Sequence, residues 1–329
     1  MKNPHLHVAT CAFLAVCCAA TQAQQSCTSA DARRNWLSGE KVMDCVTGPG
    51  LDGATVSGYD LAKAIASTTR PVHIKNTIVQ GEFNLGSAAQ LRTGHEQVAA
   101  YCAEIGPIVP LQLCRTDEEY RKLQAMREYF GGNAGVRTLS IDLEFTNVKF
   151  DMFRVQAEEM IIRGRLTFKS CQVELLEIGP AIIVRPLVFE DGQMRSLTFT
   201  NVLALDDLIV RGSSSGHVLV ERSYLRKNFL LKGAKVGSLT LKESVIKGSL
   251  VAPNSEIPGL RMWDVRVGSD VNLQGSRLPR DEISGLTFYD STVGGQIDLS
   301  NAQIDGDVNL GRLLSRTVTA GARVSGALK

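Results

Sequence analysis

Large apolar residues recur at every fifth or sixth position over most of the chain. Near the C-terminus they are Phe288, Val293, Leu299, Ile304 and Leu310, so the steps are five, six, five and six residues. An α-helix would repeat apolar residues about every 3.6 positions, and a long strand would alternate about every two. We therefore predict very short strands joined by tight corners, with about four strands in a coil of about 20–22 residues.

A second inward position lies two residues before each of these apolar residues, with one outward residue between the two. The apolar residues continue back along the chain as Phe168, Val173, Ile178, Ile183, Phe189, Met194, Phe199, Ala204, Val210, Leu225, Leu231, Val236, Leu241, Ile246, Ala252, Ile257, Met262, Val267, Leu273 and Leu278. Their partners are often small, as at Cys171, Ala181, Ser223, Ala234, Ser244, Ser255, Ser276, Ser291 and Ala302. Cys171 is therefore expected to be a buried structural thiol. The step changes near 212–217 and 279–285, where we expect polar loops to bulge outward.

Segments such as AQI (302–304), SYL (223–225) and AKV (234–236) place a small residue two positions before a large one. In this they resemble the repeats of the pentapeptide-repeat family. The resemblance implies a mainly β fold, a right-handed, four-sided parallel β-helix. It covers roughly residues 136–312, with an outlying run at 72–85. Residues 136–312 leave room for about eight coils, which at about 4.8 Å per coil form a rod about 40 Å long.

The first 23 residues have the layout of a secretory signal peptide. A lysine is followed by the apolar run VATCAFLAVCCAA and by small residues up to Ala23, where we expect cleavage. A lipoprotein signal is the alternative, but Val16 stands before Cys17 where a small residue is required. No later stretch is long and apolar enough to span a bilayer. We expect export to the periplasm or to the outside of the cell.

The remaining segments lie on either side of the repeat. Residues 24–70 are expected to form a helical N-terminal cap, and 71–85 the first strands of the β-helix. Residues 86–135 interrupt the repeat as an insertion with a helix at about 117–130, which Thr116 and Glu119 begin as a capping box. The insertion is either a lid on the rod or a binding element. Residues 313–329 are a C-terminal tail.

Five cysteines remain after signal cleavage, and an exported protein can keep disulfides. We favour the two local pairings, Cys27 with Cys45 and Cys102 with Cys114. Four cysteines allow three connectivities, and the sequence does not choose among them.

The chain contains no motif that assigns a reaction or a cofactor. His73, His95 and His217 are scattered without metal-ligand spacing, and no nucleotide-binding glycine loop is present. We therefore predict no metal and no cofactor. The formal net charge of +2 indicates no nucleic-acid partner and does not match the acidic, gyrase-binding DNA mimics of the pentapeptide-repeat family.

The strongest local feature is a basic stretch, because residues 222–247 hold seven Lys or Arg and one Glu. Stacking the coils by their apolar residues aligns Arg226 with Lys247 at one corner. It also aligns Glu221, Lys242 and Trp263 as an outward ladder. This arrangement is either a salt-paired solvated face or a shallow site for an anionic ligand. The candidate ligand-binding residues are Arg226, Lys242, Lys247 and Trp263.

We therefore predict an exported, non-catalytic solenoid that binds or scaffolds an envelope or extracellular protein or an anionic glycan. Neighbouring acids keep open the alternative of a polysaccharide lyase or hydrolase on a β-helix. These acids are Glu158–Glu159, Asp206–Asp207 and Glu190–Asp191.

Overall fold

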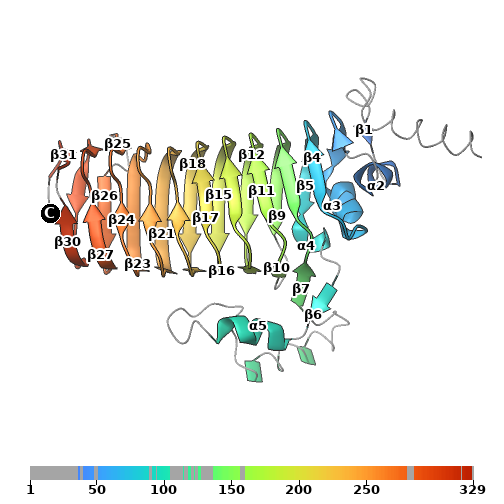
Figure 1. The fold of residues 1–329 in the computed structure, drawn as a ribbon, viewed down its shortest axis with the longest axis horizontal. Coiled ribbons are helices and arrows are strands. Elements are labelled where there is room, and N and C mark those ends of the chain that lie inside the picture. Colours follow the sequence, from blue (N-terminus) through green and yellow to red (C-terminus); the bar gives the residue numbers. More distant parts are fainter. Residues whose placement is uncertain are drawn as a thin grey trace, which may run out of the picture.

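The computed structural model describes residues 36–37, 40–47, 51–88, 91–93, 95–103, 114, 118–119, 122, 125–126, 136–155, 160–279, 285–319 and 321–327. Within these residues the chain is mainly β and forms a parallel β-solenoid of about 11 turns. Figure 1 shows the turns stacked along one long axis, with helices α2 (Glu40–Thr47) and α3 (Gly58–Ala66) at the N-terminal end. The predicted fold class is confirmed.

Each turn has four short faces, which we call A, B, C and D in chain order. Face A stacks β7 (Val136–Leu139), β10 (Met160–Ile162), β13 (Ala181–Ile183), β16 (Val202–Ala204), β19 (Tyr224–Leu225) and the last residues of β21 (Lys235–Ile246) and β23 (Gly259–Val267). Face B stacks β2 (Leu51–Asp52), β4 (Val72–Lys75), β8 (Leu143–Thr146), β11 (Leu166–Lys169), β14 (Leu187–Glu190), β17 (Leu208–Arg211), β20 (Phe229–Leu230), β22 (Leu250–Val251) and β24 (Val271–Asn272). Two later strands, β27 (Thr292–Asp298) and β30 (Leu314–Thr319), run through both faces.

Faces C and D share strands that bend between them. These strands are β5 (Ile78–Asn84), β9 (Lys149–Val155), β12 (Gln172–Ile178), β15 (Gln193–Thr200), β18 (Ser214–Glu221) and the first residues of β21. Face C also holds β1 (Trp36–Leu37), β3 (Thr55–Ser57), β25 (Arg277–Leu278), β28 (Gln303–Ile304) and β31 (Arg323–Val324). Face D continues with β23, β26 (Gly285–Tyr289) and β29 (Asp307–Asn309).

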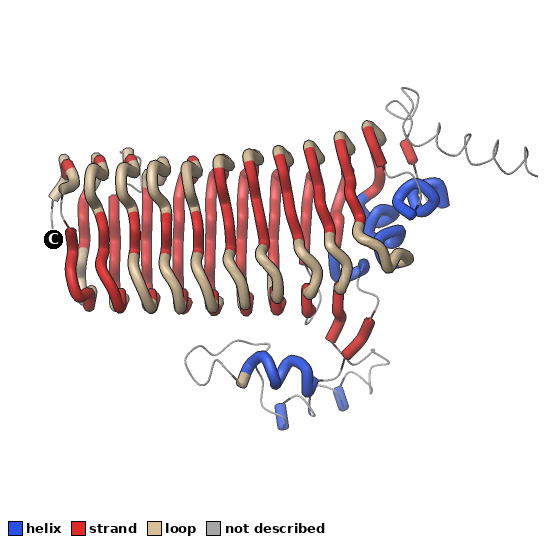
Figure 2. Tube along the Cα trace, viewed as in Figure 1, coloured by secondary structure: helices blue, strands red, loops and turns tan. Residues whose placement is uncertain are grey.

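The register shows that a standard turn takes 21 residues. On face B, Leu187 pairs with Leu208 and Leu208 pairs with Phe229, and both differences are 21. Between residues 136 and 312 face B contains eight strands, from β8 to β27, which confirms the predicted eight coils. Figure 2 shows the strands of successive turns aligned along the rod, with loops at the corners.

The register also locates the irregular turns. Val72 pairs with Leu143, a difference of 71, so the insertion adds 50 residues to a 21-residue turn without breaking the stack. Gly259 pairs with Gly285, a difference of 26, so this turn has five more residues than the standard turn. The loop predicted near 279–285 lies mostly outside the described residues. The predicted bulge at 212–217 is wrong, because β18 keeps the 21-residue register there. Ser215 fills the inward position and donates its hydroxyl to the carbonyl of residue 217 at 3.0 Å.

The inward residues form one apolar column through the rod. Every apolar residue that the repeat marks as inward is buried, apart from Leu310, which is partly buried. On face B the rings of Phe145, Phe168 and Phe189 stack at centroid distances of 5.3 and 4.8 Å. The column is most exposed in the last turn, where Val318 is 39% and Val324 41% exposed. The next turn of the stack therefore shields each inward residue from solvent.

Two corners of most turns have a residue with positive φ, a backbone conformation that Asn, Asp and Gly adopt most easily. Between faces B and C these residues are Gly53, Asn76, Asn147, Ser170, Asp191, Gly212, Gly233, Asn254, Gly275 and Asn301. Between faces D and A they are Asn201, Arg222, Glu243, Asp264, Asp290 and Arg312. The residue that follows each of these positive-φ residues points inward. This explains why the repeat often has a small residue two positions before each large apolar one.

Serine at this inward corner position bonds the backbone of its own and the neighbouring turn. The Ser244 hydroxyl accepts from the Ser223 N–H at 3.1 Å and donates to the Lys242 carbonyl at 2.7 Å. The Ser223 hydroxyl likewise accepts from the Val202 N–H at 3.1 Å. Both hydroxyls lie in residues that are at most 1% exposed, so they satisfy backbone groups that water does not reach.

The two ends of the repeat differ from the sequence-based boundaries. Strands β2 and β3 already belong to the solenoid, so the stack begins within the segment assigned to the cap. Helix α3 follows them, with the Ser57 hydroxyl accepting from the Asp60 N–H at 3.4 Å as its N-cap. At the other end β30 and β31 form a further turn from residues assigned to the tail.

Ser244→Ala should lower the free energy of unfolding by about 1–3 kcal/mol, because it leaves the buried Ser223 N–H without its acceptor. Urea unfolding would measure the change. Ser238→Ala, on the outward side of the same strand, is the matched control and should have a much smaller effect. Equal effects of the two substitutions would contradict a structural role for the inward hydroxyl.

Candidate functional site

The insertion packs against face A. The outward residues of this face are apolar over five turns, and we call them the face A stripe: Ile161, Ile182, Leu203, Tyr224 and Val245. The stripe is buried, in one cluster with Val98 of helix α5 (His95–Cys102), and Tyr101 packs against that cluster. Figure 2 shows α5 lying along the flank of the rod. The structure thus places α5 on the solenoid as a cover of the face A stripe.

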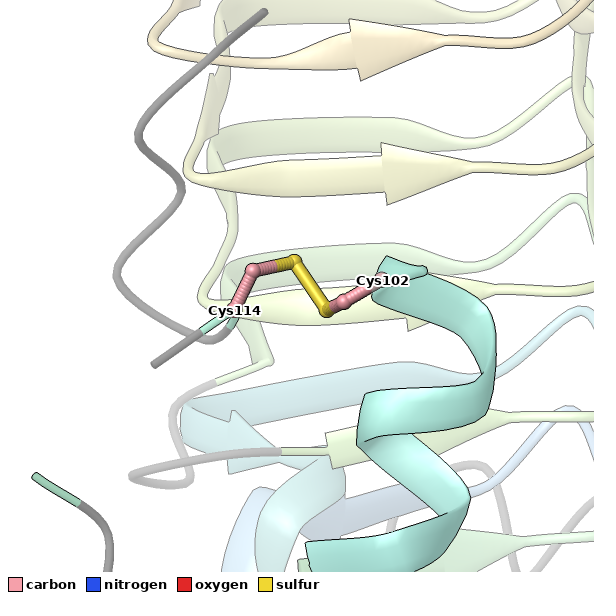
Figure 3. The surroundings of a disulfide bond; sticks show 2 residues. All are labelled: Cys102 and Cys114. Atoms are coloured by element: carbon pink, nitrogen blue, oxygen red, sulfur yellow. A yellow bond between two sulfur atoms is a disulfide. The ribbon is translucent and has the colours of Figure 1, made fainter. Parts of the chain in front are cut away.

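Further elements join the insertion to the rod. Helix α4 (Leu85–Ala88) leaves β5, and β6 (Leu91–Thr93) pairs antiparallel with β7. A disulfide joins Cys102 at the end of α5 to Cys114, with the sulfurs 2.06 Å apart, as Figure 3 shows. This bond confirms one predicted pairing. Cys45 is also disulfide-bonded, while its predicted partner Cys27 lies outside the described residues.

The predicted helix at 117–130 lies mostly outside the described residues. Positions 118–119, 122 and 125–126 are helical, and Lys122 pairs with Glu118 at 2.7 Å one helical turn away. Met126 in this segment is 58% exposed.

Face D carries the outward ladder that the sequence predicts. Lys242 pairs in register with Glu221 on one side and with Trp263 on the other. The Lys242 ammonium lies 2.9 Å from the Glu221 carboxylate and 3.4 Å from Glu243. The hydrogen bond to Glu221 raises the pKa of Lys242, so this side chain stays charged well above neutral pH. Lys242 is therefore held within an ion-pair cluster beside Trp263.

The ladder extends one turn further than the sequence pattern predicts. Trp263 pairs in register with Tyr289, which is 46% exposed. The Arg261 guanidinium lies 5.8 Å from the centre of the Trp263 ring, and that of Arg312 lies 5.8 Å from the Tyr289 ring. Both distances suit cation–π contacts. We call these four residues the aromatic–arginine row: Arg261, Trp263, Tyr289 and Arg312.

Arg226 and Lys247 lie elsewhere. They follow the last residue of face A in successive turns, at the corner between faces A and B. Face A, about 10 Å wide, therefore separates them from Lys242 and Trp263. The four predicted site residues do not form one surface. Lys247 instead lines a groove of about 560 Å³ on face A, together with Arg266.

A second groove, of about 540 Å³, follows the bend between faces C and D. It contains two carboxylates, those of Glu174 and Glu256, together with Arg195 and Lys235. Glu174 forms an ion pair with Arg195 at 3.9 Å. The two carboxylates are four turns apart in the register, which is about 19 Å at about 4.8 Å per turn. Hydrolysis of one glycosidic bond requires a separation of about 5–9.5 Å, so this pair does not fit that chemistry.

The acid pairs that suggested an enzyme form contacts between neighbouring turns. This holds for the pairs that lie within the described residues. Asp206 accepts from the Lys227 ammonium at 2.6 Å, and Asp207 accepts from the Asn228 N–H at 3.0 Å. Glu190 lies 3.3 Å from Arg211 of the next turn. Glu158–Glu159 lies outside the described residues.

No protein-family model, curated protein or solved structure matches this chain. Over the described residues, no helix has the length and apolar character needed to cross a bilayer. The same residues contain no cluster of three or more His, Cys, Asp or Glu side chains that could hold a metal ion.

The Cys171 thiol should not react with Ellman's reagent at pH 8 while the protein is folded. Burial raises its pKa to about 11, so the thiol stays protonated, and the residue is only 2% exposed. Unfolding in denaturant should release a signal that Cys171→Ala lacks. Rapid labelling of the folded protein at this residue would contradict its burial.

Val98→Asp should separate α5 from the face A stripe, because it places a carboxylate in a buried apolar cluster. The expected result is a severalfold increase in the fluorescence of an apolar dye, with the β-sheet circular dichroism retained. Ala100→Asp, on the exposed side of the same helix, is the control. Unchanged dye binding by the Val98 variant would show that α5 does not cover the stripe in solution.

Proposed function

We propose that this protein is an exported, non-catalytic β-solenoid that binds an anionic glycan in the cell envelope or outside the cell. The observation that carries the proposal is the aromatic–arginine row on face D. It places two aromatic rings on consecutive turns, each with a guanidinium 5.8 Å from the ring centre.

The chemistry of the row suits an acidic sugar polymer. Indole and phenol rings offer flat apolar surfaces for the C–H faces of sugar rings. The Arg261 guanidinium can bind a carboxylate or sulfate through two parallel hydrogen bonds, whereas Arg312 already donates to the Asp290 carboxylate at 3.2 Å. Trp263 and Tyr289 are about 4.8 Å apart along the rod, because they occupy the same position in neighbouring turns. A row that follows the rod axis suits a linear polymer better than a compact ligand.

A protein is the second candidate ligand, because the side-chain types of the row are also common in protein-binding sites. Trp, Tyr and Arg are the side chains that most often dominate protein–protein binding energy. A rigid rod with such a row would then act as a scaffold for another envelope or extracellular protein.

The disulfides support export. Disulfides persist in oxidising compartments and are rare in the cytosol, and this chain has one at Cys102–Cys114 and another at Cys45. Both are compatible with the secretory signal expected over residues 1–23.

Isothermal titration with polygalacturonate, heparin and neutral dextran would test the glycan proposal. We expect the protein to bind at least one acidic polymer and not dextran. Trp263→Ala combined with Tyr289→Ala should weaken binding by at least about tenfold, because the stacking surface is lost. Tyr59→Ala removes an aromatic side chain that is 66% exposed on α3, outside the row, and should leave binding unchanged.

Three other outcomes would count against the proposal. Equal affinity for dextran would show that the anionic groups are not recognised. Unchanged affinity of the double variant would place binding elsewhere. Release of reducing or unsaturated ends during the titration would favour the enzyme alternative.

A further inference from the structure

Face A continues beyond the part that the insertion covers. After Val245, which is 8% exposed, its outward positions are Arg266, Thr292 and Leu314 in successive turns. Leu314 is 70% exposed, the highest value among the large apolar residues described. The face therefore changes from a buried apolar stripe to an open surface with a cation and an exposed leucine.

This open surface is hollowed at the corner between faces A and B. The groove of about 560 Å³ found there is bordered by Lys247, Arg266 and Leu314. Gly268 and Gly294 follow Lys247 at the same position in the next two turns. A Cβ at Gly268 would come within 2.1 Å of the Lys247 carbonyl oxygen, and a Cβ at Gly294 within 2.3 Å of that of Gly268. Only glycine fits both positions, so the notch is a fixed part of the turn.

The charge of the groove is positive. The ion pairs formed between described residues include neither Lys247 nor Arg266, although many other cations of the rod pair with a carboxylate of a neighbouring turn. A groove with two cations beside an exposed leucine matches a ligand that has both negative charge and apolar side chains.

The covered part of face A indicates what kind of segment packs on this face. Helix α5 lies on the preceding turns and places Val98 and Tyr101 against the face A stripe. We infer that the groove docks an acidic protein segment with large apolar side chains, which lies on face A next to α5. Such a segment would continue an interface that α5 has begun, through apolar anchors of the kind that hold amphipathic helices in grooves.

The charges also argue against two other occupants. A second copy that docked through the same groove would bring Lys247 and Arg266 of both copies together, which repulsion disfavours. A glycan would gain little from Leu314, which has no flat ring for stacking. The inference is independent of glycan binding by the aromatic–arginine row, which lies on face D.

Fluorescence anisotropy with a labelled peptide would test the inference on the full chain. The probe is a peptide of about 12 residues with leucines on one helical side and glutamates elsewhere. We expect saturable binding. Lys247→Glu combined with Arg266→Glu should weaken it at least about tenfold. Leu314→Ser should also weaken it, and this exposed position is not needed for folding.

Matched controls separate docking from general charge attraction. Lys63→Glu combined with Lys232→Glu makes the same charge change at exposed positions outside the groove and should leave binding unchanged. A peptide with its leucines replaced by serine should bind much more weakly. A peptide with lysine in place of glutamate should bind the Lys247→Glu and Arg266→Glu variant better than the unmodified protein.

Several results would overturn the inference. One is equal binding of the leucine and serine peptides, which would indicate non-specific attraction. Another is failure of the charge-swapped pair to restore binding. Concentration-dependent dimers that Leu314→Ser abolishes would assign the groove to a second copy. Loss of peptide binding in the Trp263→Ala variant would show that the peptide binds face D instead. Loss of glycan binding with peptide binding retained would bear only on the proposed function.

Discussion

Parallel backbone hydrogen bonds between neighbouring turns govern the architecture of the rod. The N–H of Leu208 donates to the Asn228 carbonyl at 3.1 Å, and the N–H of Phe229 donates to Ser249 at 3.0 Å. Because such bonds recur on each face, neighbouring turns must follow nearly the same path. The 21-residue turn, the positive-φ corners and the inward serines all satisfy this requirement.

Departures from the repeat are tolerated where they leave the stacked strands unchanged. The insertion leaves after β5, and the chain returns through β7 so that β8 and β9 still pair with β4 and β5. Five extra residues lie between β25 and β26 in the sequence, and the paired register resumes at Gly285. Loops can be lengthened at little cost in free energy when they lie outside the packed column.

These departures create the distinctive surfaces of the rod. The insertion divides face A into a covered part and an open part, and the open part contains the groove with Lys247 and Arg266. The longer turn aligns Trp263 with Tyr289 on face D. Both surfaces lie toward the C-terminal end, on adjacent faces that meet at the corner residues Asp264 and Asp290. A rigid solenoid holds them at a constant separation, which suits simultaneous binding of two ligands.

The solenoid could be predicted from the amino-acid sequence alone, because inward positions obey a local rule. A small residue after the corner and a large one two positions later recur in each turn, and this predicted the burial of Phe168, Phe189 and Cys171. The rule also has a limit: Ser215 occupies an inward position with a polar side chain, so the pattern wrongly predicts a loop there.

The folded chain was needed to show which outward surfaces are separated and which are covered. Neighbours on the outside depend on the number of residues in each intervening turn, and the 26-residue turn placed Tyr289 beside Trp263. Aligning Met262 with Phe288 as inward residues would have revealed this pair in advance. The separation of Lys247 from Lys242 by face A, and the contact of Val98 with the stripe, required the folded chain. Packing between segments far apart in sequence sets these contacts, and no local periodicity encodes them.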